Sequence, residues 1–228
     1  MTDARDRLVL GLDVGDLDHA LGIAARLAPW FSAVKVGIEL YAEAGPGAFD
    51  ALHAEGFKVF ADMKLHDIPN TVARAARVFG RRGIEFLNFH AAGGAHMLRA
   101  GVEAYREGAR DAGHSAPIAL GVTVLTSDAD TRAFAHRLAV ADKAGCDGVV
   151  CSALEIGAVR PLGLRTMVAG IRRRGDDVND QARVATPTEA IASGADWLVI
   201  ARTMTAADDP SAAAAEVAAE VDAAVPVT

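Results

Sequence analysis

Charged side chains that could carry acid–base chemistry follow short apolar runs in the N-terminal half of the chain. Asp13 follows the first run and Lys35 lies within the second. Asp62 and Lys64 end the third, where strand alternation puts both side chains on one face, and Asp67 follows at the mouth of the next helix. An array of carboxylates and ammonium groups that alternates in sign shifts pKa values in the way that active sites use.

The elements that must position these residues repeat one unit, a short β-rich apolar run followed by a longer Ala-rich stretch with helical periodicity. Eight such units predict an α/β fold with one domain over residues 1–228, a single (β/α)8 TIM barrel, better than an open doubly wound sheet. Active sites of such barrels lie at the C-terminal ends of the strands, where the charged residues stand. The expected strands are Leu8–Leu12, Ala33–Gly37, Lys58–Met63, Glu85–His90, Ile118–Val124, Gly148–Cys151, Thr166–Gly170 and Trp197–Ala201.

Four of the expected helices have clear sequence signals. Acidic residues in a first turn suit the helix dipole, and a proline suits the first helical position. The segment between Gly170 and Arg183 is polar throughout. A polar loop of this length in a compact barrel is usually a lid or a binding loop. The expected helices are Asp16–Ala28, Pro69–Arg82, Pro187–Ser193 and Ser211–Ala224.

Each charged residue, taken singly, also has an ordinary structural interpretation. Asp13 or Asp16 would cap the first helix, Lys35 would extend to solvent, and Asp67 would cap the next helix. Asp62 and Lys64 would form a simple ion pair. His90, at the end of a further apolar run, would be a satisfied core histidine. Together these interpretations leave four or five charges at one end of an apolar barrel without purpose, so the array favours a catalytic site.

Residues 61–71 read Ala-Asp-Met-Lys-Leu-His-Asp-Ile-Pro-Asn-Thr, which matches the signature DxKxxDIPxT. On this motif the chain resembles the orotidine 5′-phosphate decarboxylase family, and the resemblance runs nearly end to end. A DxKxxD element alone also occurs in related sugar-phosphate lyases, but the continuation through Ile68 to Thr71 is much more specific. The other matching elements are Leu10–Asp13, Val34–Gly37, Asn88–Gly94, Val122–Ser127, Gly170–Arg172, Asp180–Arg183, Thr186–Pro187 and Ile200–Arg202.

The resemblance implies a carboxy-lyase that converts orotidine 5′-monophosphate to uridine 5′-monophosphate (UMP) and CO2, the last step of de novo pyrimidine biosynthesis, with neither metal nor organic cofactor. Lys64 looks like the general acid that protonates C6, and Asp62 like the carboxylate beside the substrate's own. Lys35 and Asp13 resemble the residues that hold the ribose hydroxyls, with Lys35 also part of the charged network.

The same resemblance implies a homodimer with shared active sites. Asp67 and Thr71 resemble residues that reach the neighbouring subunit's site, and Ile68 goes with them as an apolar wall. The remaining substrate-binding residues implied are Ser127 at the pyrimidine edge and Gln181 and Arg202 at the phosphate.

The sequence departs from the family pattern at the phosphate end. Ala169 and Thr203 stand where the family usually has proline, and Asn179 and Ala201 where it usually has glycine. An added methyl group matters where the backbone approaches a phosphate closely. We therefore expect weaker phosphate binding or altered loop closure, with the chemistry retained.

Composition excludes several other classes. With 51% hydrophobic residues and a net charge of −7, the chain is neither disordered nor suited to nucleic acid as its main partner. No apolar run reaches the ~18 residues of a membrane helix, and the polar N-terminus does not read as a secretory signal. The two cysteines, Cys146 and Cys151, read as buried hydrophobes in a reducing cytoplasm, and no metal-binding motif is legible.

Two other functions remain open at this point. One is a Mg²⁺-dependent decarboxylase or aldolase of keto-sugar phosphates on the same barrel, in which the paired acids and Glu39 would hold the metal. The other is a non-catalytic barrel that binds a nucleotide, which the intact Asp62, Lys64 and Asp67 disfavour.

Overall fold

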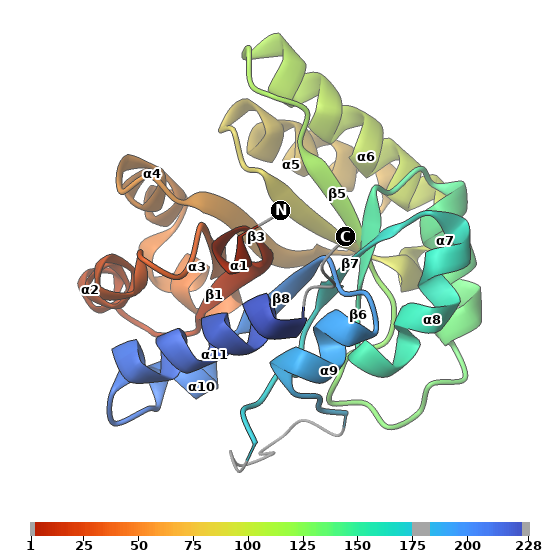
Figure 1. Ribbon diagram of the computed structural model, residues 1–228. Helices are drawn as coiled ribbons and strands as arrows, with labels where there is room; N and C mark the ends of the chain where they lie inside the picture. Colours follow the sequence, from red (N-terminus) through yellow and green to blue (C-terminus); the bar gives the residue numbers. More distant parts are fainter. Residues whose placement is uncertain (1–2, 175–182, 225–228) are drawn as a thin grey trace.

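Eight parallel strands form a closed barrel in the computed structural model, which describes residues 3–174 and 183–224. Neighbouring strands follow sequence order, and β1 closes the barrel on β8, with the helices on the outside (Figure 1). This topology confirms the predicted TIM barrel. The strands are β1 Leu8–Leu12, β2 Ala33–Val36, β3 Lys58–Leu65, β4 Phe86–His90, β5 Ile118–Val122, β6 Gly148–Cys151, β7 Arg165–Val168 and β8 Trp197–Ile200.

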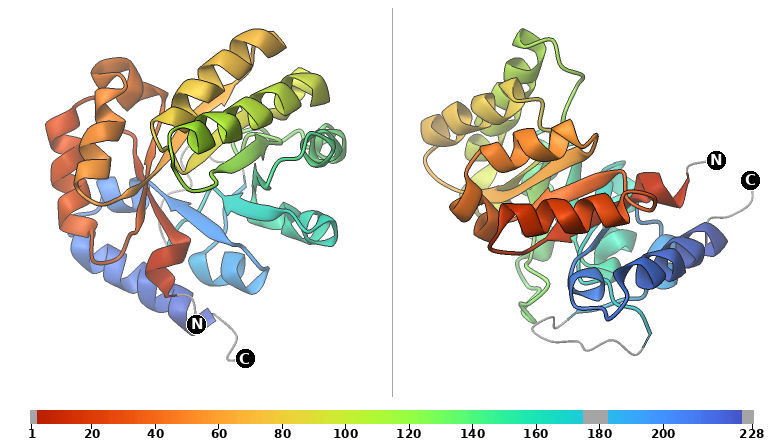
Figure 2. Two further views of the ribbon diagram at one scale, coloured as in Figure 1. Left: turned by 90° about the horizontal axis from the view of Figure 1, so that it is seen from above. Right: turned by 90° about the vertical axis from the view of Figure 1, so that its left-hand side faces the viewer.

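The four expected helices form with ends within one residue of the predicted ones. Asp16 caps α2 through the amide of His19, and Thr186 and Glu189 form a capping box on α9. The first and last helices lie side by side, since the Ala4 amide donates to Asp222 (Figure 2). The helices are α1 Ala4–Arg7, α2 Leu17–Leu27, α3 Ile38–Ala44, α4 Gly47–Ala54, α5 Pro69–Arg81, α6 Gly94–Asp111, α7 Phe134–Lys143, α8 Ile156–Val159, α9 Pro187–Ala192, α10 Arg202–Thr205 and α11 Pro210–Ala224, with 3₁₀ turns η1 Ala91–Gly93, η2 Ala153–Glu155 and η3 Arg160–Leu162.

Alternation along the strands separates two apolar layers. In β1, Leu8, Leu10 and Leu12 belong to the large layer between barrel and helices, whereas Val9 belongs to a smaller cluster inside the barrel. None of the helices in the described ranges is long and apolar enough to cross a membrane. The buried residues of the inner cluster are Val9, Ala33, Phe60, Phe86, Leu120, Met167 and Val199.

The layer of side chains above this inner cluster contains charged residues. Side chains two positions further along a strand point the same way, so Lys35 follows Ala33 and Asp62 follows Phe60 on the inner face. The inner apolar cluster therefore acts as the floor of a site at the C-terminal ends of the strands.

Gly11 occupies this upper layer in β1, directly below the methyl group of Ala201. A β-carbon added at Gly11 would lie 2.6 Å from the β-carbon of Ala201 and 3.4 Å from Cε of Lys35. The small residue therefore leaves room for both neighbours.

We predict that Gly11→Ala lowers the free energy of unfolding by about 1–3 kcal/mol, because the methyl group of Ala201 is fixed to its backbone and cannot rotate away from the added methyl group. Ala201→Gly removes the obstructing atom, so in that background Gly11→Ala costs much less. Denaturant unfolding of the two single variants and the double variant measures this coupling; equal losses in both backgrounds would contradict it.

Candidate active site

A cavity of about 280 Å³ opens above the inner apolar cluster, at the C-terminal ends of the strands. Its apolar wall includes Phe60, Val122 and Val199. Among the described residues, four cations and two carboxylates line it, although the whole chain is acidic. The predicted site residues that line the cavity are Asp13, Lys35, Asp62, Lys64, Ser127 and Arg202.

The centre of the cavity is a chain of alternating charges. Nζ of Lys35 lies 2.6 Å from Oδ1 of Asp13 and 3.5 Å from Oδ2 of Asp62. Nζ of Lys64 lies 2.7 Å from Oδ1 of the same Asp62 carboxylate. Lys35 is buried and does not extend to solvent, and Asp13 pairs with it, while Asp16 caps the helix. The interpretation that Lys35 extends to solvent is therefore wrong, whereas the cap predicted at Asp13 or Asp16 is confirmed at Asp16.

Burial and charge act on this cluster in opposite directions. Burial alone would raise the pKa of the Asp62 carboxyl, but the charges of Lys35 and Lys64 and the hydrogen bonds it accepts hold that pKa below its usual value. Burial would likewise lower the pKa of the Lys35 ammonium, but Asp62 and Asp13 raise it. Both groups are thus kept charged at neutral pH.

Lys64 reaches Asp62 through an unusual backbone. Its φ is +48°, and the pairing of β3 with β4 shifts register between Ala61 and Leu65. Asn88 of β4 holds this turn, because its Oδ1 accepts from the Lys64 amide at 2.6 Å and its Nδ2 donates to Oδ1 of Asp62 at 2.6 Å. The expected meeting of Asp62 and Lys64 occurs, but by a bulge rather than by regular alternation.

Asn88 and Arg172 are site residues that lie in sequence elements matching the family but were given no role of their own. Asn88 is fully buried and holds Lys64 and Asp62 together, and the signal for it was a lone amide inside the apolar run Phe-Leu-Asn-Phe. Arg172 is buried, lines the cavity and donates to the Ile171 carbonyl at 2.8 Å. Its signal was a basic residue two positions after Gly170, just beyond β7.

The residues expected to serve a neighbouring subunit lie outside the cavity lining. Asp67, Ile68 and Thr71 are exposed, and the Ile68 side chain is 66% accessible. Asp67 accepts from the Ile68 amide at 2.6 Å, while Ile68 is the N-cap of α5 with no side-chain cap, so Asp67 is not the helix cap. Gln181, expected at the phosphate, and Asn179 lie outside the described residues.

At the phosphate end, Arg202 begins α10 and lines the cavity together with Ala169 and Ala201. The extra methyl of Ala201 is directed towards Gly11 of β1. Thr203, where the family usually has proline, is buried, and its hydroxyl has no hydrogen-bond partner among the described residues.

Neither His90 nor Glu39 is among the described residues that line the cavity. His90 stacks on His66 with ring centroids 5.6 Å apart, and burial, with the charges of Arg137, His66 and Lys64, lowers its pKa. Glu39 is exposed on α3 and does not line the cavity. Within residues 3–174 and 183–224, no group of three or more His, Cys, Asp or Glu residues is arranged to hold a metal ion.

Both cysteines are free and buried. Burial raises the pKa of the Cys146 thiol to about 12, helped by the charge of Asp147, and burial also raises the pKa of Cys151. Neither thiol is therefore a reactive thiolate at neutral pH, in agreement with the prediction that they are small buried hydrophobes.

The barrel and its charged cavity define a TIM-barrel enzyme with its active site at the C-terminal ends of the strands. A sequence profile of the orotidine 5′-phosphate decarboxylase / HUMPS family matches residues 6–217, and the chain belongs to this family. The resemblance predicted from the sequence is confirmed.

Known relatives align with almost the whole chain. An orotidine 5′-phosphate decarboxylase of Moorella thermoacetica is 44% identical, with 96% of this chain and 93% of the relative covered. One from Halorhodospira halophila is 45% identical, with 96% and 97% covered. A crystal structure of orotidine 5′-phosphate decarboxylase from Lactobacillus acidophilus has a TM-score of 0.79 and 32% identity, covering 95% of this chain and 99% of that one.

The lowered pKa of Asp62 predicts how stability depends on pH. The unfolded chain protonates this carboxyl near pH 3.9, roughly the ordinary value for aspartate, whereas the folded chain keeps it ionised to lower pH. At neutral pH we expect Asp62→Asn to be less stable by about 3 kcal/mol, because two ammonium groups lose their carboxylate. This difference shrinks as pH falls through the lowered folded pKa. Urea unfolding of both proteins from pH 7 to pH 3 measures it; a difference that does not change with pH would contradict the assignment.

Proposed function

We propose that this chain decarboxylates orotidine 5′-monophosphate to UMP and CO2 through the cluster of Lys35, Asp62 and Lys64. The reaction is the one its close relatives are named for, and it belongs to pyrimidine biosynthesis. The observation that carries the site assignment is the largely buried carboxylate of Asp62, which is held between two ammonium groups in the charged layer above the apolar floor of the cavity.

The cluster suits the chemistry of this reaction. Loss of CO2 from C6 of the pyrimidine leaves a carbanion with little resonance stabilisation, so the site must supply fixed charge where the negative charge develops. The Lys64 ammonium supplies that charge and then donates its proton to C6. Asp62 lies beside the departing carboxylate and keeps Lys64 aimed at the cavity.

The other cavity residues suit the remaining parts of a nucleotide. Asp13 and Lys35 hold the ribose hydroxyls, and Ser127 contacts the edge of the pyrimidine. Arg202 binds the phosphate as a bidentate fork, with Gln181 as its proposed partner. The excess of cations over carboxylates in the lining favours an anionic ligand of this kind.

We further propose that the chain works as a one-domain homodimer in the cytoplasm. Asp67, Ile68 and Thr71 are exposed although they directly follow the catalytic strand, and an exposed isoleucine beside an acid suits an interface. They would complete the partner subunit's site. Free, buried thiols fit a reducing compartment.

The reaction is tested by following the loss of orotidine 5′-monophosphate absorbance with the purified protein, with and without EDTA. We expect equal turnover in both, because Asp13 and Asp62 are each engaged by lysine ammonium groups that would repel a divalent cation. Activity that EDTA removes would point to the metal-dependent alternative, and absence of turnover in both conditions would overturn the proposal.

We predict that Lys64→Ala lowers kcat by at least about 10³-fold, since both the fixed charge and the proton donor are lost. UMP binding, measured by calorimetry, should remain within about tenfold of wild type, because the phosphate and ribose contacts lie elsewhere. A fully active Lys64→Ala protein would refute the role of Lys64 as proton donor.

Sharing of active sites is tested by mixing two inactive variants, Lys64→Ala and Asp67→Asn. If Asp67 serves the partner's site, each mixed dimer has one intact site, and re-equilibrated mixtures should regain about a quarter of wild-type activity. If Asp67 acts within its own subunit, every site stays defective and no activity returns. Size-exclusion chromatography with light scattering confirms that dimers are present.

A further inference from the structure

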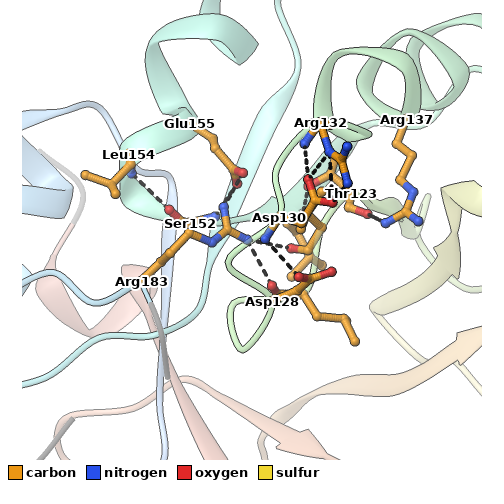
Figure 3. Close-up of polar contacts among 12 residues, drawn as sticks. Thr123, Asp128, Asp130, Arg132, Arg137, Ser152, Leu154, Glu155 and Arg183 are labelled. Atoms are coloured by element: carbon orange, nitrogen blue, oxygen red, sulfur yellow. Dashed lines mark hydrogen bonds and ion pairs between the residues drawn. The ribbon is translucent and has the colours of Figure 1, made fainter. Parts of the chain in front are cut away.

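Two arginines bind three consecutive backbone carbonyl groups just beyond β5. Arg137 of α7 donates to the Thr123 carbonyl at 2.8 Å. Arg183 donates through Nη2 to the carbonyls of Val124 at 3.2 Å and Leu125 at 2.9 Å. Figure 3 shows both arginines directed at this part of the chain. Residues 124–127 all line the cavity, so their backbone position shapes it.

Arg183 is itself fixed from the opposite side. It forms an ion pair with Glu155, and both side chains are only 8% exposed (Figure 3). Glu155 is held in turn by the Ser152 amide, which donates to its Oε2 at 2.9 Å in the capping box of η2. Arg183 therefore ties the segment after β5 to the end of β6.

The guanidinium group of Arg183 suits this connection. Its planar set of donors reaches a carboxylate on one side and two carbonyl oxygens on the other, which the point charge of a lysine does not do. Burial removes competing water and makes such charged hydrogen bonds stronger than exposed ones. Neither Arg183 nor Glu155 lines the cavity, so neither contacts a ligand there directly.

We propose that Arg183, anchored by Glu155, is a positioning residue that holds residues 124–127 against the pyrimidine end of the cavity. The proposal rests on the proposed function, because that function places Ser127 at the pyrimidine edge. Without the connection, the segment moves away from the base, while Asp13, Lys35 and Arg202, which come from other elements, keep their places.

The test compares a ligand that has the base with one that lacks it. For Arg183→Gln we expect the inhibition constant of UMP to rise by about tenfold, the size expected for lost charged hydrogen bonds. The inhibition constant of ribose 5-phosphate, which carries no base, should stay unchanged. Equal weakening of both ligands, or an unchanged UMP constant, would overturn the proposal. General loosening of the barrel would weaken the binding of UMP and of ribose 5-phosphate alike.

Three further variants make the result specific. Arg132→Gln is the matched control, because Arg132 lies on the loop after β5 that also holds residues 124–127, and its side chain is 91% exposed and paired with Asp130. This variant should leave both inhibition constants unchanged. Arg183→Lys should restore only part of the UMP affinity, and full restoration would argue against the fork geometry. If Arg183→Gln does not fold because Glu155 is left buried and unpaired, the double variant Glu155→Gln/Arg183→Gln removes that charge and takes the same comparison.

Ser127→Ala separates this proposal from the one on which it rests. Loss of UMP affinity in Ser127→Ala with no change in Arg183→Gln refutes the positioning role and leaves the base contact intact. Selective loss of UMP affinity in Arg183→Gln with no change in Ser127→Ala supports the positioning role and refutes the specific contact of Ser127.

Discussion

The site depends on the carboxylate of Asp62, which accepts from Lys64 and Asn88 and also faces Lys35. A largely buried carboxylate is costly unless it is paired and hydrogen-bonded, and the same holds for the buried ammonium group of Lys35. Asp62 and Lys35 are therefore tolerated in the barrel because each is paired with the other and with a second charged partner. The same pairing fixes the Lys64 ammonium group beside Asp62, which is the preorganised charge that the proposed carbanion chemistry needs.

The barrel supplies this arrangement through the period of its strands. Phe60 and Asp62 share the inner face of β3, one in the apolar cluster and one in the charged layer above it. The strand then departs from the regular period at the left-handed backbone of Lys64 and the register shift with β4. As a result, the Lys64 ammonium group lies beside Asp62. A positive φ at a lysine costs about 1–3 kcal/mol, and Asn88 offsets part of that cost through the Lys64 amide. Strain in this chain thus lies at the residue proposed to do the chemistry.

The fold was predictable because its information is local and periodic, whereas the limits of several strands were not. β5 was expected to run to Val124 but ends at Val122, and the carbonyls beyond it bond to Arg137 and Arg183. An apolar run does not reveal whether its carbonyls bond to a neighbouring strand or to a distant arginine. For the same reason the motif identified Asp62 and Lys64, while Asn88 and Arg183, whose partners are 24 to 59 positions away, required the folded chain.

Net charge illustrates the same division between what is local and what the fold creates. The chain carries −7 overall, yet the cavity lining, within the described residues, holds four cations against two carboxylates. Composition reports the solvated outer surface, where most acids lie, and it says nothing about which strand ends converge. The convergence of β2, β3, β7 and β8 brings Lys35, Lys64, Arg172 and Arg202 to one mouth. An acidic protein can therefore hold an anionic nucleotide, because its basic residues are concentrated by topology rather than by number.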